Sequence, residues 1–360
     1  MVIISHKNLN KFSMDIKKIL KQAVEEKASD VHLIVNSAPV LRKNGELFYL
    51  KNLGVVKQEA LEKGVNSVVN EEQKKRFEAE YDLDFSYSLE GSRFRINIYR
   101  EKGNYCFAAR VIPESRPSLD EIGMPEFTKD LLNSDKGLIL VTGPTGCGKS
   151  TTLAAMVNYI NKNRKKNIIT LEDPIEFVFE QNQSVITQRQ LGTDMTSFAS
   201  GLKHVLRQDP DVVMVGEMRD LETIATTITL AETGHLVLAT LHTYNAAQTV
   251  DRIIDIFPSH QQNQIRSQVA NTLKAVFSQR LIPIIKGSRV AAREIMIKNA
   301  AIANLVRENK ISQIRSVIET NKEEGMVTMD SELKRLYKDG VISEEDARAH
   351  MENPEYLTQK

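Results

Sequence analysis

An eight-residue loop, Gly143-Pro144-Thr145-Gly146-Cys147-Gly148-Lys149-Ser150, constrains the fold more than any other part of the sequence because it has the spacing GxxxxGKS. An apolar run over 138–142 precedes this loop, and a helical pattern over 149–159 follows it. Glycine allows backbone conformations that other residues avoid, so several amide N–H groups can converge on an anion at the start of the helix. The sequence therefore predicts a strand, a phosphate-binding loop and a helix in succession.

Each part of the loop has an expected role toward a nucleotide. We expect Lys149 to reach the β- and γ-phosphates and the Ser150 hydroxyl to bind Mg²⁺. Cys147 is best interpreted as a small residue at a variable position, although a thiol near a helix start can also be reactive. The predicted nucleotide contacts in this segment are Gly143, Pro144, Thr145, Gly146, Cys147, Gly148, Lys149, Ser150 and Thr151.

Three further apolar runs, over 167–171, 211–216 and 236–241, alternate with helical patterns. Strands covered on both faces read as continuous apolar runs, so these segments predict an α/β fold with a parallel sheet between helices. After residue 259 the pattern predicts helices, apart from a strand over 290–297.

Before the loop, shorter alternating runs predict a small mixed α/β domain. Its expected elements are a helix from residue 14, strands over 31–35, 40–42 and 47–50, a helix over 56–80, and strands over 85–89, 93–99 and 105–111. The predicted organisation is an extension (1–13), an N-terminal domain (14–112), a proline-containing linker (113–119), a nucleotide-binding core (120–285) and a mostly helical C-terminal region (286–360).

The composition excludes some classes of protein. The 360 residues carry a formal net charge of +1, which gives no support for nucleic acid or an anionic membrane held by bulk electrostatics. The two cysteines, Cys106 and Cys147, form no CxxC pair and indicate neither a zinc ribbon nor a disulfide framework. No apolar run approaches the ~18 residues of a membrane span. We therefore expect a cytoplasmic protein that meets a membrane only through partners.

Acidic residues follow two of the predicted strands, as hydrolysis of a bound nucleotide requires. Glu172-Asp173-Pro174-Ile175-Glu176 follows the strand over 167–171, and Glu217 follows the strand over 211–216. A third strand ends at His242. Surface acids at strand ends are common, and a lone histidine there is more often structural than a phosphate sensor. Beside a phosphate loop, however, the two acidic stations favour a hydrolytic site.

Five ordered segments together resemble the secretion and type IV pilus ATPases, and within them the members that retract pili. They are the phosphate loop, 171–177 (LEDPIEF), 206–211 (LRQDPD), 215–223 (VGEMRDLET) and 231–236 (AETGHL). The resemblance runs from about residue 14 to the C-terminus. It implies a PAS-like N-terminal domain, a RecA-like ATPase core and a homohexameric ring that binds ATP between domains and neighbouring chains. It also implies an inner-membrane pilus platform protein as partner, at the inner face of the cytoplasmic membrane.

The resemblance also implies roles for particular residues. Glu176 matches the general base, Glu217 the acid on the Mg²⁺ side, and His242 the histidine that senses the γ-phosphate. Arg95 and Arg110 match arginines that the family presents to the nucleotide, although either could be a solvated strand residue. Arg207 is a weaker candidate of the same kind.

A C-terminal segment over 301–308 (AIANLVRE) resembles the AIRNLIRE signature of the retraction ATPases. Ala303 replaces an arginine of that signature, and Val306 replaces an isoleucine. The segment is also interpretable as an amphipathic helix packed on the core, and the two interpretations are compatible.

Other functions remain open at this point. A pilus-extension or secretion ATPase would commonly carry paired CxxC motifs and a larger N-terminal region, and an accessory retraction ATPase fits the motifs less well. A nucleotide-gated binding module would not need two acidic stations. A nucleic-acid translocase is disfavoured by the neutral charge balance.

Overall fold

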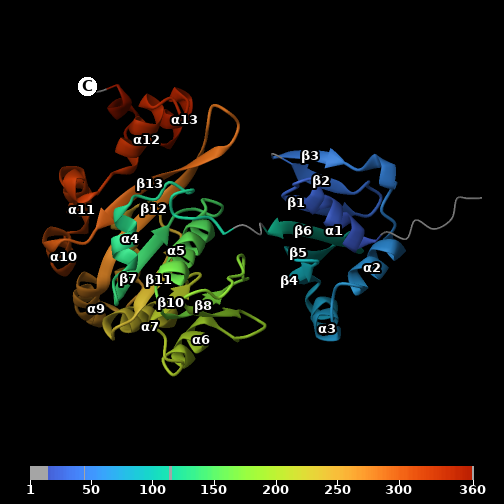
Figure 1. The fold of residues 1–360 in the computed structure, drawn as a ribbon, viewed down its shortest axis with the longest axis horizontal. Helices are drawn as coiled ribbons and strands as arrows, with labels where there is room; N and C mark the ends of the chain where they lie inside the picture. The colour runs from blue at the N-terminus through green and yellow to red at the C-terminus, as the bar shows by residue number, and fades with distance from the viewer. Residues whose placement is uncertain (1–14, 44, 113–115, 359–360) are drawn as a thin grey trace, which may run out of the picture. The chain divides into compact units, whose positions relative to one another are not determined.

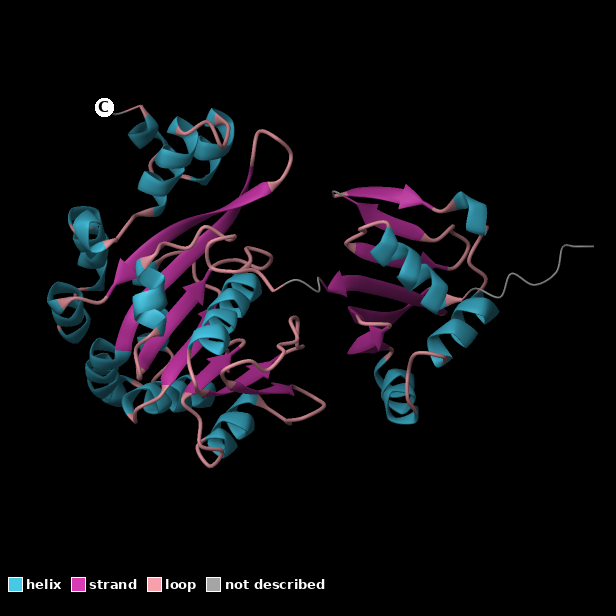
Figure 2. Cartoon of the chain, in the orientation of Figure 1, coloured by secondary structure: helices cyan, strands magenta, loops and turns pink. Residues whose placement is uncertain are grey.

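The computed structural model describes residues 15–43, 45–112 and 116–358 (Figures 1 and 2). By its internal contacts the chain divides into two units, residues 1–115 and 116–360. The predicted extension 1–13, the turn residue Asn44 and linker residues 113–115 lie outside the described residues.

The first unit is built on a six-stranded antiparallel sheet in the order β3-β2-β1-β6-β5-β4. Along β5 the burial alternates, so that Phe94, Ile96 and Ile98 enter the core while Arg93 and Arg95 face the other way. The elements are α1 (Ile16–Glu25), β1 (Asp30–Ile34), β2 (Val40–Lys43), β3 (Glu46–Tyr49), η1 (Lys51–Leu53), α2 (Gln58–Asn66), α3 (Glu71–Glu80), β4 (Asp82–Leu89), β5 (Ser92–Glu101) and β6 (Asn104–Ile112).

The single helix predicted over 56–80 is wrong, because the structure has two helices, α2 and α3, in that range. A capping box starts the second helix: the Asn70 side chain accepts from the Gln73 backbone N–H, and the Gln73 side chain accepts from the Asn70 N–H. These two bonds satisfy backbone N–H groups that lack partners only at the start of a helix, so they mark the beginning of a new helix. The N-x-x-Q spacing in the sequence was the signal for the break.

The second unit contains a seven-stranded sheet in the order β13-β12-β7-β11-β10-β8-β9. The neighbours from β12 to β9 are parallel, and β13 is antiparallel to β12. The strands are β7 (Gly137–Thr142), β8 (Asn167–Glu172), β9 (Val185–Gln190), β10 (Val212–Val215), β11 (Leu236–Leu241), β12 (Leu273–Pro283) and β13 (Arg289–Ile297).

Helices cover this sheet on both faces (Figure 1). Leu138 and Leu140 of β7 belong to a core with the helices α7, α8 and α9, whereas Ile139 and Val141 belong to a core with α5. This alternation explains the continuous apolar runs and confirms the predicted parallel α/β sheet. The helices are α4 (Phe127–Leu132), α5 (Lys149–Asn163), α6 (Phe198–Val205), α7 (Leu221–Glu232), α8 (Ala246–Asp255), α9 (Ser259–Thr272), α10 (Ala300–Arg307), η2 (Ile311–Gln313), α11 (Ile314–Thr320), η3 (Lys322–Glu324), α12 (Met329–Lys338), α13 (Glu344–His350) and η4 (Pro354–Leu357).

Two strands of the second unit were not predicted. The helical prediction after residue 259 holds for α9 but is wrong for β12, an eleven-residue strand that begins directly at the end of that helix. The edge strand β9 was also missed, because three of its last four residues carry polar or charged side chains of intermediate burial. The strand predicted over 290–297 is confirmed as β13.

In the part of the chain that the structure describes, every helix is too short or too polar to cross a lipid bilayer.

Candidate nucleotide site

The phosphate loop joins β7 to α5, as its sequence predicted, and it needs its glycines for both conformation and space. Gly143, Gly146 and Gly148 have φ values of 142°, 77° and 90°. A Cβ added at Gly143 would lie 2.3 Å from the backbone oxygen of Gln279 and 2.6 Å from Cys147 Sγ. The loop is therefore folded against β12, and a larger residue at Gly143 would displace it.

Lys149 closes over this loop from the first turn of α5. Its Nζ donates to Gly143 O at 2.8 Å and to Pro144 O at 3.1 Å. Burial lowers the pKa of Lys149 from its usual value, and the nearby carboxylates of Glu217 and Glu176 oppose that change. The partners of the half-buried ammonium are all neutral, namely these two carbonyls and His242 Nδ1 at 3.5 Å, so the ammonium is placed to gain from an anion on the loop.

The remaining loop positions lie between these two ends. Cys147 is 3% exposed, and burial raises the pKa of its thiol. This direction supports its interpretation as a small packed residue, since a reactive thiol needs a lowered pKa. Ser150 and Thr151 follow Lys149 in the first turn of α5, and both are partly exposed.

Gln279 is a loop-holding residue that the sequence did not reveal. Its side chain is 1% exposed on β12, where Nε2 donates to Cys147 O at 2.9 Å and Oε1 accepts from Thr152 Oγ1 at 3.0 Å. One amide thus ties the loop and the following helix to a strand 132 residues away. No local motif surrounds Gln279, so only the fold could identify it.

Gln279→Leu is expected to weaken nucleotide binding about tenfold, because the unsatisfied Cys147 carbonyl and Thr152 hydroxyl would let the loop move. Its matched control is Ser278→Ala, which removes the buried Thr142–Ser278 hydrogen bond of 2.8 Å on the neighbouring position. Both variants should lose about 1–3 kcal/mol of stability. Titration of a fluorescent nucleotide into both variants measures their nucleotide affinities. An affinity loss in Ser278→Ala as large as that in Gln279→Leu would contradict the prediction.

Glu217 and His242 meet beside the loop. Glu217 Oε1 accepts from His242 Nε2 at 3.1 Å, and His242 Nδ1 lies 3.5 Å from Lys149 Nζ. Burial, reinforced by the charge of Lys149, lowers the pKa of His242, so the imidazole is neutral at pH 7. The structure therefore brings Lys149, Glu217 and His242 together at the carboxyl edge of the sheet, the usual ligand edge of such folds.

Arg219 belongs to the same group but was given no role from the sequence. Its Nε lies 2.6 Å from Glu217 Oε1, and its side chain is largely exposed. The residue stands inside the segment 215–223 that carried the family resemblance, and this was the available signal. With His242, it holds the Glu217 carboxylate in place.

A close approach of strands explains the glycine before Glu217. Gly216 N donates to Leu171 O at 2.8 Å, and a Cβ added at Gly216 would lie 3.0 Å from the same oxygen. A side chain at this position would crowd the end of β8. The spacing leaves Glu217 as the acid that faces the loop.

Glu176 lies on a loop that β9 supports. Gln190 Oε1 accepts from Ile175 N at 3.2 Å, while Gln188 accepts from Phe179 N at 2.9 Å and donates to Phe177 O at 2.7 Å. These bonds hold the backbone on both sides of Glu176. Gln188 and Gln190 thus position this loop, and their polar side chains are one reason why β9 was not predicted as a strand.

Glu172 is buried beneath that loop, where its Oε1 accepts from Thr170 Oγ1 at 2.7 Å and from Gln188 Nε2 at 3.0 Å. Its side chain therefore faces the interior between β8 and β9. Burial raises the pKa of this carboxyl above its usual value. It is a structural acid, in contrast to the partly exposed Glu176.

The raised pKa of Glu172 predicts a pH dependence of stability. A group whose folded pKa exceeds its unfolded value of 4.5 stabilises the fold fully below pH 4.5, and that stabilisation is lost as pH rises through the folded pKa. Glu172→Gln keeps both acceptor bonds without the charge, so its stability relative to the parent should increase from acid to neutral pH. Urea unfolding of both proteins at several pH values measures this difference, and a pH-independent difference would refute it.

Oxygen donors at the site suit Mg²⁺ shared with a phosphate. Ser150 and Glu217 offer a hydroxyl and a carboxylate, and among the described residues no group of three or more His, Cys, Asp or Glu could enclose a metal by itself. Mg²⁺ commonly takes one or two protein oxygens together with phosphates and water. The donor set therefore fits Mg²⁺ that arrives with a nucleotide.

Arg95 and Arg110 lie directly opposite each other on neighbouring strands of the first unit, β5 and β6. Arg110 Nε lies 2.9 Å from Asp30 Oδ1, and Arg95 Nε lies 4.0 Å from Asp84 Oδ1. Like charges at opposed positions repel one another, and the two aspartates offset this cost. Both arginines lie on the face of that sheet away from its core.

Within the chain, Arg207 lies apart from the phosphate loop. It follows α6, and the next carbonyls, of Gln208 and Asp209, each accept from Asn167 Nδ2 at 2.8 Å. Asn167 begins β8, so Arg207 lies at the amino edge of the sheet, opposite the loop.

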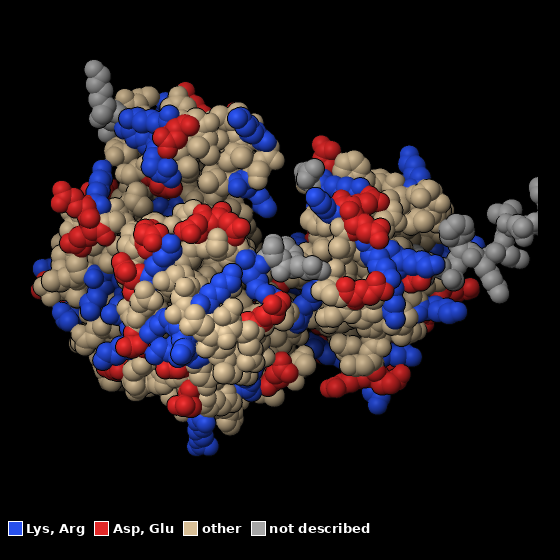
Figure 3. Space-filling view, viewed as in Figure 1, with Lys and Arg blue, Asp and Glu red and all other residues tan. Residues whose placement is uncertain are grey.

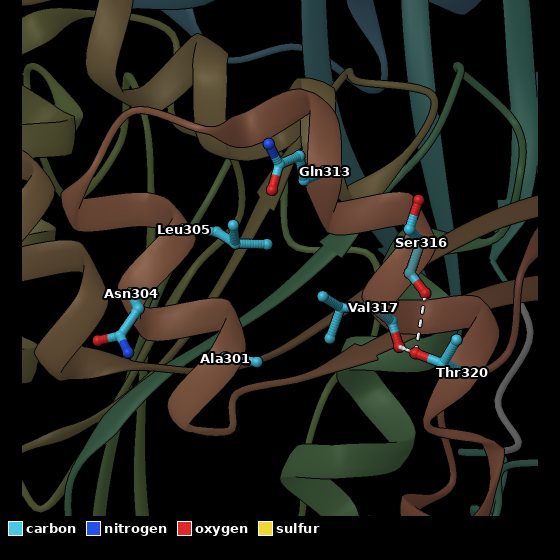
Figure 4. Close-up of a pocket in the computed structure, with 7 residues that line it drawn as sticks. All are labelled: Ala301, Asn304, Leu305, Gln313, Ser316, Val317 and Thr320. Carbon is cyan, nitrogen blue, oxygen red and sulfur yellow. Dashed lines mark hydrogen bonds between the residues drawn. The ribbon is translucent and has the colours of Figure 1, made fainter.

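The C-terminal signature forms α10, an amphipathic helix packed on the core through Ile302, Ala303 and Val306. With α11 it lines an open groove, in which Ala301 and Leu305 face Val317 (Figure 4). Thr320 Oγ1 bonds back to the carbonyl of Ser316 at 3.0 Å. The expected amphipathic helix is thus confirmed.

The strand–loop–helix unit, with acids and a histidine at the carboxyl edge of a parallel sheet, defines a P-loop nucleotide-binding protein. The chain belongs to the family described as type II/IV secretion system protein, whose match extends over residues 73–352.

Relatives and solved structures agree with this assignment. The chain is 43% identical to the type IV pilus retractation ATPase PilT of Pseudomonas aeruginosa, over 95% of this chain and 99% of the relative. It is 44% identical to a twitching motility protein of Neisseria gonorrhoeae, over 95% of this chain and 92% of the relative. A crystal structure of the pilus retraction motor PilT with bound ADP is similar with a TM-score of 0.90 and 44% identity, covering 96% of this chain and 99% of that one.

Proposed function

We propose that this protein is an ATP-hydrolysing motor that drives retraction of a type IV pilus. The observation that carries the proposal is the convergence of Lys149, Glu217 and His242 beside a glycine-rich loop. Relatives of nearly the same length that bear the names of a pilus retraction ATPase and a twitching motility protein indicate the work that hydrolysis performs.

In the proposed mechanism each side chain has one task. The loop amides and Lys149 bind the β- and γ-phosphates, and Glu176 orients the attacking water and accepts its proton. Mg²⁺ held by Ser150 and Glu217 would neutralise charge on the phosphate oxygens. His242, neutral and bonded to Glu217, reports whether a γ-phosphate is present.

Positive charge at the γ-phosphate is the remaining need of the reaction. We assign this task to Arg95 and Arg110, which stand side by side on the first unit. In related reactions an arginine of this kind raises turnover about 10³–10⁵-fold. Arginines from a different unit would make hydrolysis depend on closure of the two units around the nucleotide.

The same family assignment supports a proposal about assembly and location. We propose a homohexameric ring, in which closure and opening pass from one site to the next and displace an inner-membrane pilus platform protein. The ring would act in the cytoplasm at the inner face of the cytoplasmic membrane and meet the membrane only through that partner.

Filament behaviour in cells that lack this chain tests the proposal. We expect hyperpiliated cells whose filaments do not retract, because extension would continue unopposed. Bald cells would indicate a pilus-extension ATPase instead. Normal retraction in cells that carry only the Glu217→Gln protein would favour a nucleotide-gated binding module, and stimulation of turnover by DNA would favour a translocase.

A further inference from the structure

A pocket at the amino edge of the seven-stranded sheet, opposite the phosphate loop, is lined by three basic side chains. Its volume is about 580 Å³, and its charged lining residues are Lys274, Lys298 and Arg307. Lys274 is the second residue of β12, Lys298 directly follows β13, and Arg307 is the last residue of α10. The polar residues Ser134, Asn299 and Asn304 complete the hydrophilic part of the lining.

The pocket is separate from the phosphate loop. Lys274 packs over Gly137, since a Cβ added at that glycine would lie 2.6 Å from Lys274 Cγ. Gly137 begins β7, whereas the phosphate loop follows Thr142 at its other end. The six residues of β7 span roughly 20 Å, so one ligand of phosphate size cannot occupy both places.

Neutral oxygens hold two of the cations in place. Arg307 donates to Asn271 Oδ1 at 2.9 Å and to Asn304 Oδ1 at 3.2 Å, and Lys298 Nζ donates to Asn271 O at 3.3 Å. The carboxylate of Glu324 bonds to the amide of Asn299 at 2.9 Å instead of to a cation. The basic groups are therefore oriented by partners that leave their charge uncompensated.

Lys298 and Arg307 bond to asparagine oxygens, and among the described residues no ion pair joins Lys274, Lys298 or Arg307 to a carboxylate. Burial, and next the charges of Lys274 and Arg307, lower the pKa of Lys298. On the face of the larger unit drawn in Figure 3, in contrast, basic and acidic side chains lie interspersed. Like charges gathered in a concavity raise the local concentration of anions.

We propose that this pocket, lined by Lys274, Lys298 and Arg307, binds a ligand with at least two phosphate groups, either free or in a phospholipid headgroup. A guanidinium and two ammonium groups supply donors to several oxygens at once, which matches phosphate better than a single carboxylate. Ala303 also lines the pocket, at the position where the retraction signature has an arginine. The small residue leaves room there that a long side chain would fill.

Calorimetric titration of inorganic pyrophosphate into the full-length Lys149→Ala protein, at low ionic strength, tests the pocket without a competing phosphate loop. We expect binding there, and a tenfold or larger loss of affinity in a protein that also carries Lys298→Gln and Arg307→Gln. The control carries Lys310→Gln and Lys322→Gln, two exposed lysines outside the pocket, and has the same net charge. It should bind pyrophosphate like its parent.

Thermal unfolding of the ligand-free proteins separates a binding defect from misfolding. If the double variant does not fold, Lys274→Gln replaces it, since this change keeps most of the stem over Gly137. Sedimentation with phosphatidylcholine vesicles, with or without cardiolipin, identifies the source of the phosphate groups. Binding that requires cardiolipin and is lost in the Lys298→Gln, Arg307→Gln protein indicates a phospholipid headgroup. If the protein does not bind cardiolipin vesicles, the ligand is a free phosphate compound. Absence of pyrophosphate binding, or binding that the pocket substitutions leave unchanged, would overturn the proposal.

Discussion

Glu217→Gln is expected to leave ATP binding intact and to lower turnover by about 10²–10³-fold. Glutamine has the shape of glutamate, and its oxygen can still accept from Arg219 and His242. It lacks the negative charge that a Mg²⁺-side ligand must provide as the phosphate bond breaks. Binding should therefore survive while the chemical step fails.

Phosphate release and nucleotide titration on the same preparation measure these two effects. Glu222→Gln is the matched control, because Glu222 is an exposed acid in α7 that pairs with Lys203 away from the loop. The control should hydrolyse ATP at the parent rate. Parent-like turnover by Glu217→Gln itself would remove Glu217 from the hydrolytic site.

Lys149→Ala is expected to weaken ATP binding by at least about 10²-fold. The lost interactions are charge-assisted hydrogen bonds to phosphate, each contributing about 1.5–3 kcal/mol. The half-buried position of Lys149 strengthens them, because less water screens the charge. The fold should persist, since the lysine bonds only to two loop carbonyls and lies near His242.

Equilibrium titration of a fluorescent ATP analogue measures this loss. Lys203→Ala serves as the control, because it removes a lysine of the same unit that pairs with Glu222 outside the site. Circular dichroism of both variants checks the fold. Unchanged ATP affinity in a folded Lys149→Ala protein would contradict the assignment of the loop.

The parallel sheet could be predicted because its central strands are buried on both faces. Helices cover both faces of β10 (Val212–Val215) and β11 (Leu236–Leu241). Nearly every residue of these strands is therefore apolar, which makes the strands visible in the sequence. The phosphate loop was equally accessible, since its function requires glycines at fixed positions. These features depend on local sequence and a simple period.

The parts that escaped prediction depend on distant contacts. Lys274, Gln279 and Arg280 interrupt the apolar pattern of β12. Gln279 is polar because it bonds to a loop 132 residues away, and Gln188 on β9 is polar because it supports the loop of Glu176. A sequence window contains neither partner. The pairing of Glu217 with Arg219 and His242 likewise required the sheet to be assembled first.

The hairpin of β12 and β13 gives the proposed motor a mechanical path. In β12, Gln279 hydrogen-bonds to the phosphate loop. In β13, the buried Glu294 accepts from the Ala246 backbone N–H at 2.8 Å and lies 3.5 Å from the Met329 backbone nitrogen. These two amides begin α8 and α12. A displacement that nucleotide imposes on the loop would therefore pass along the hairpin to the starts of α8, in the core, and α12, in the C-terminal region.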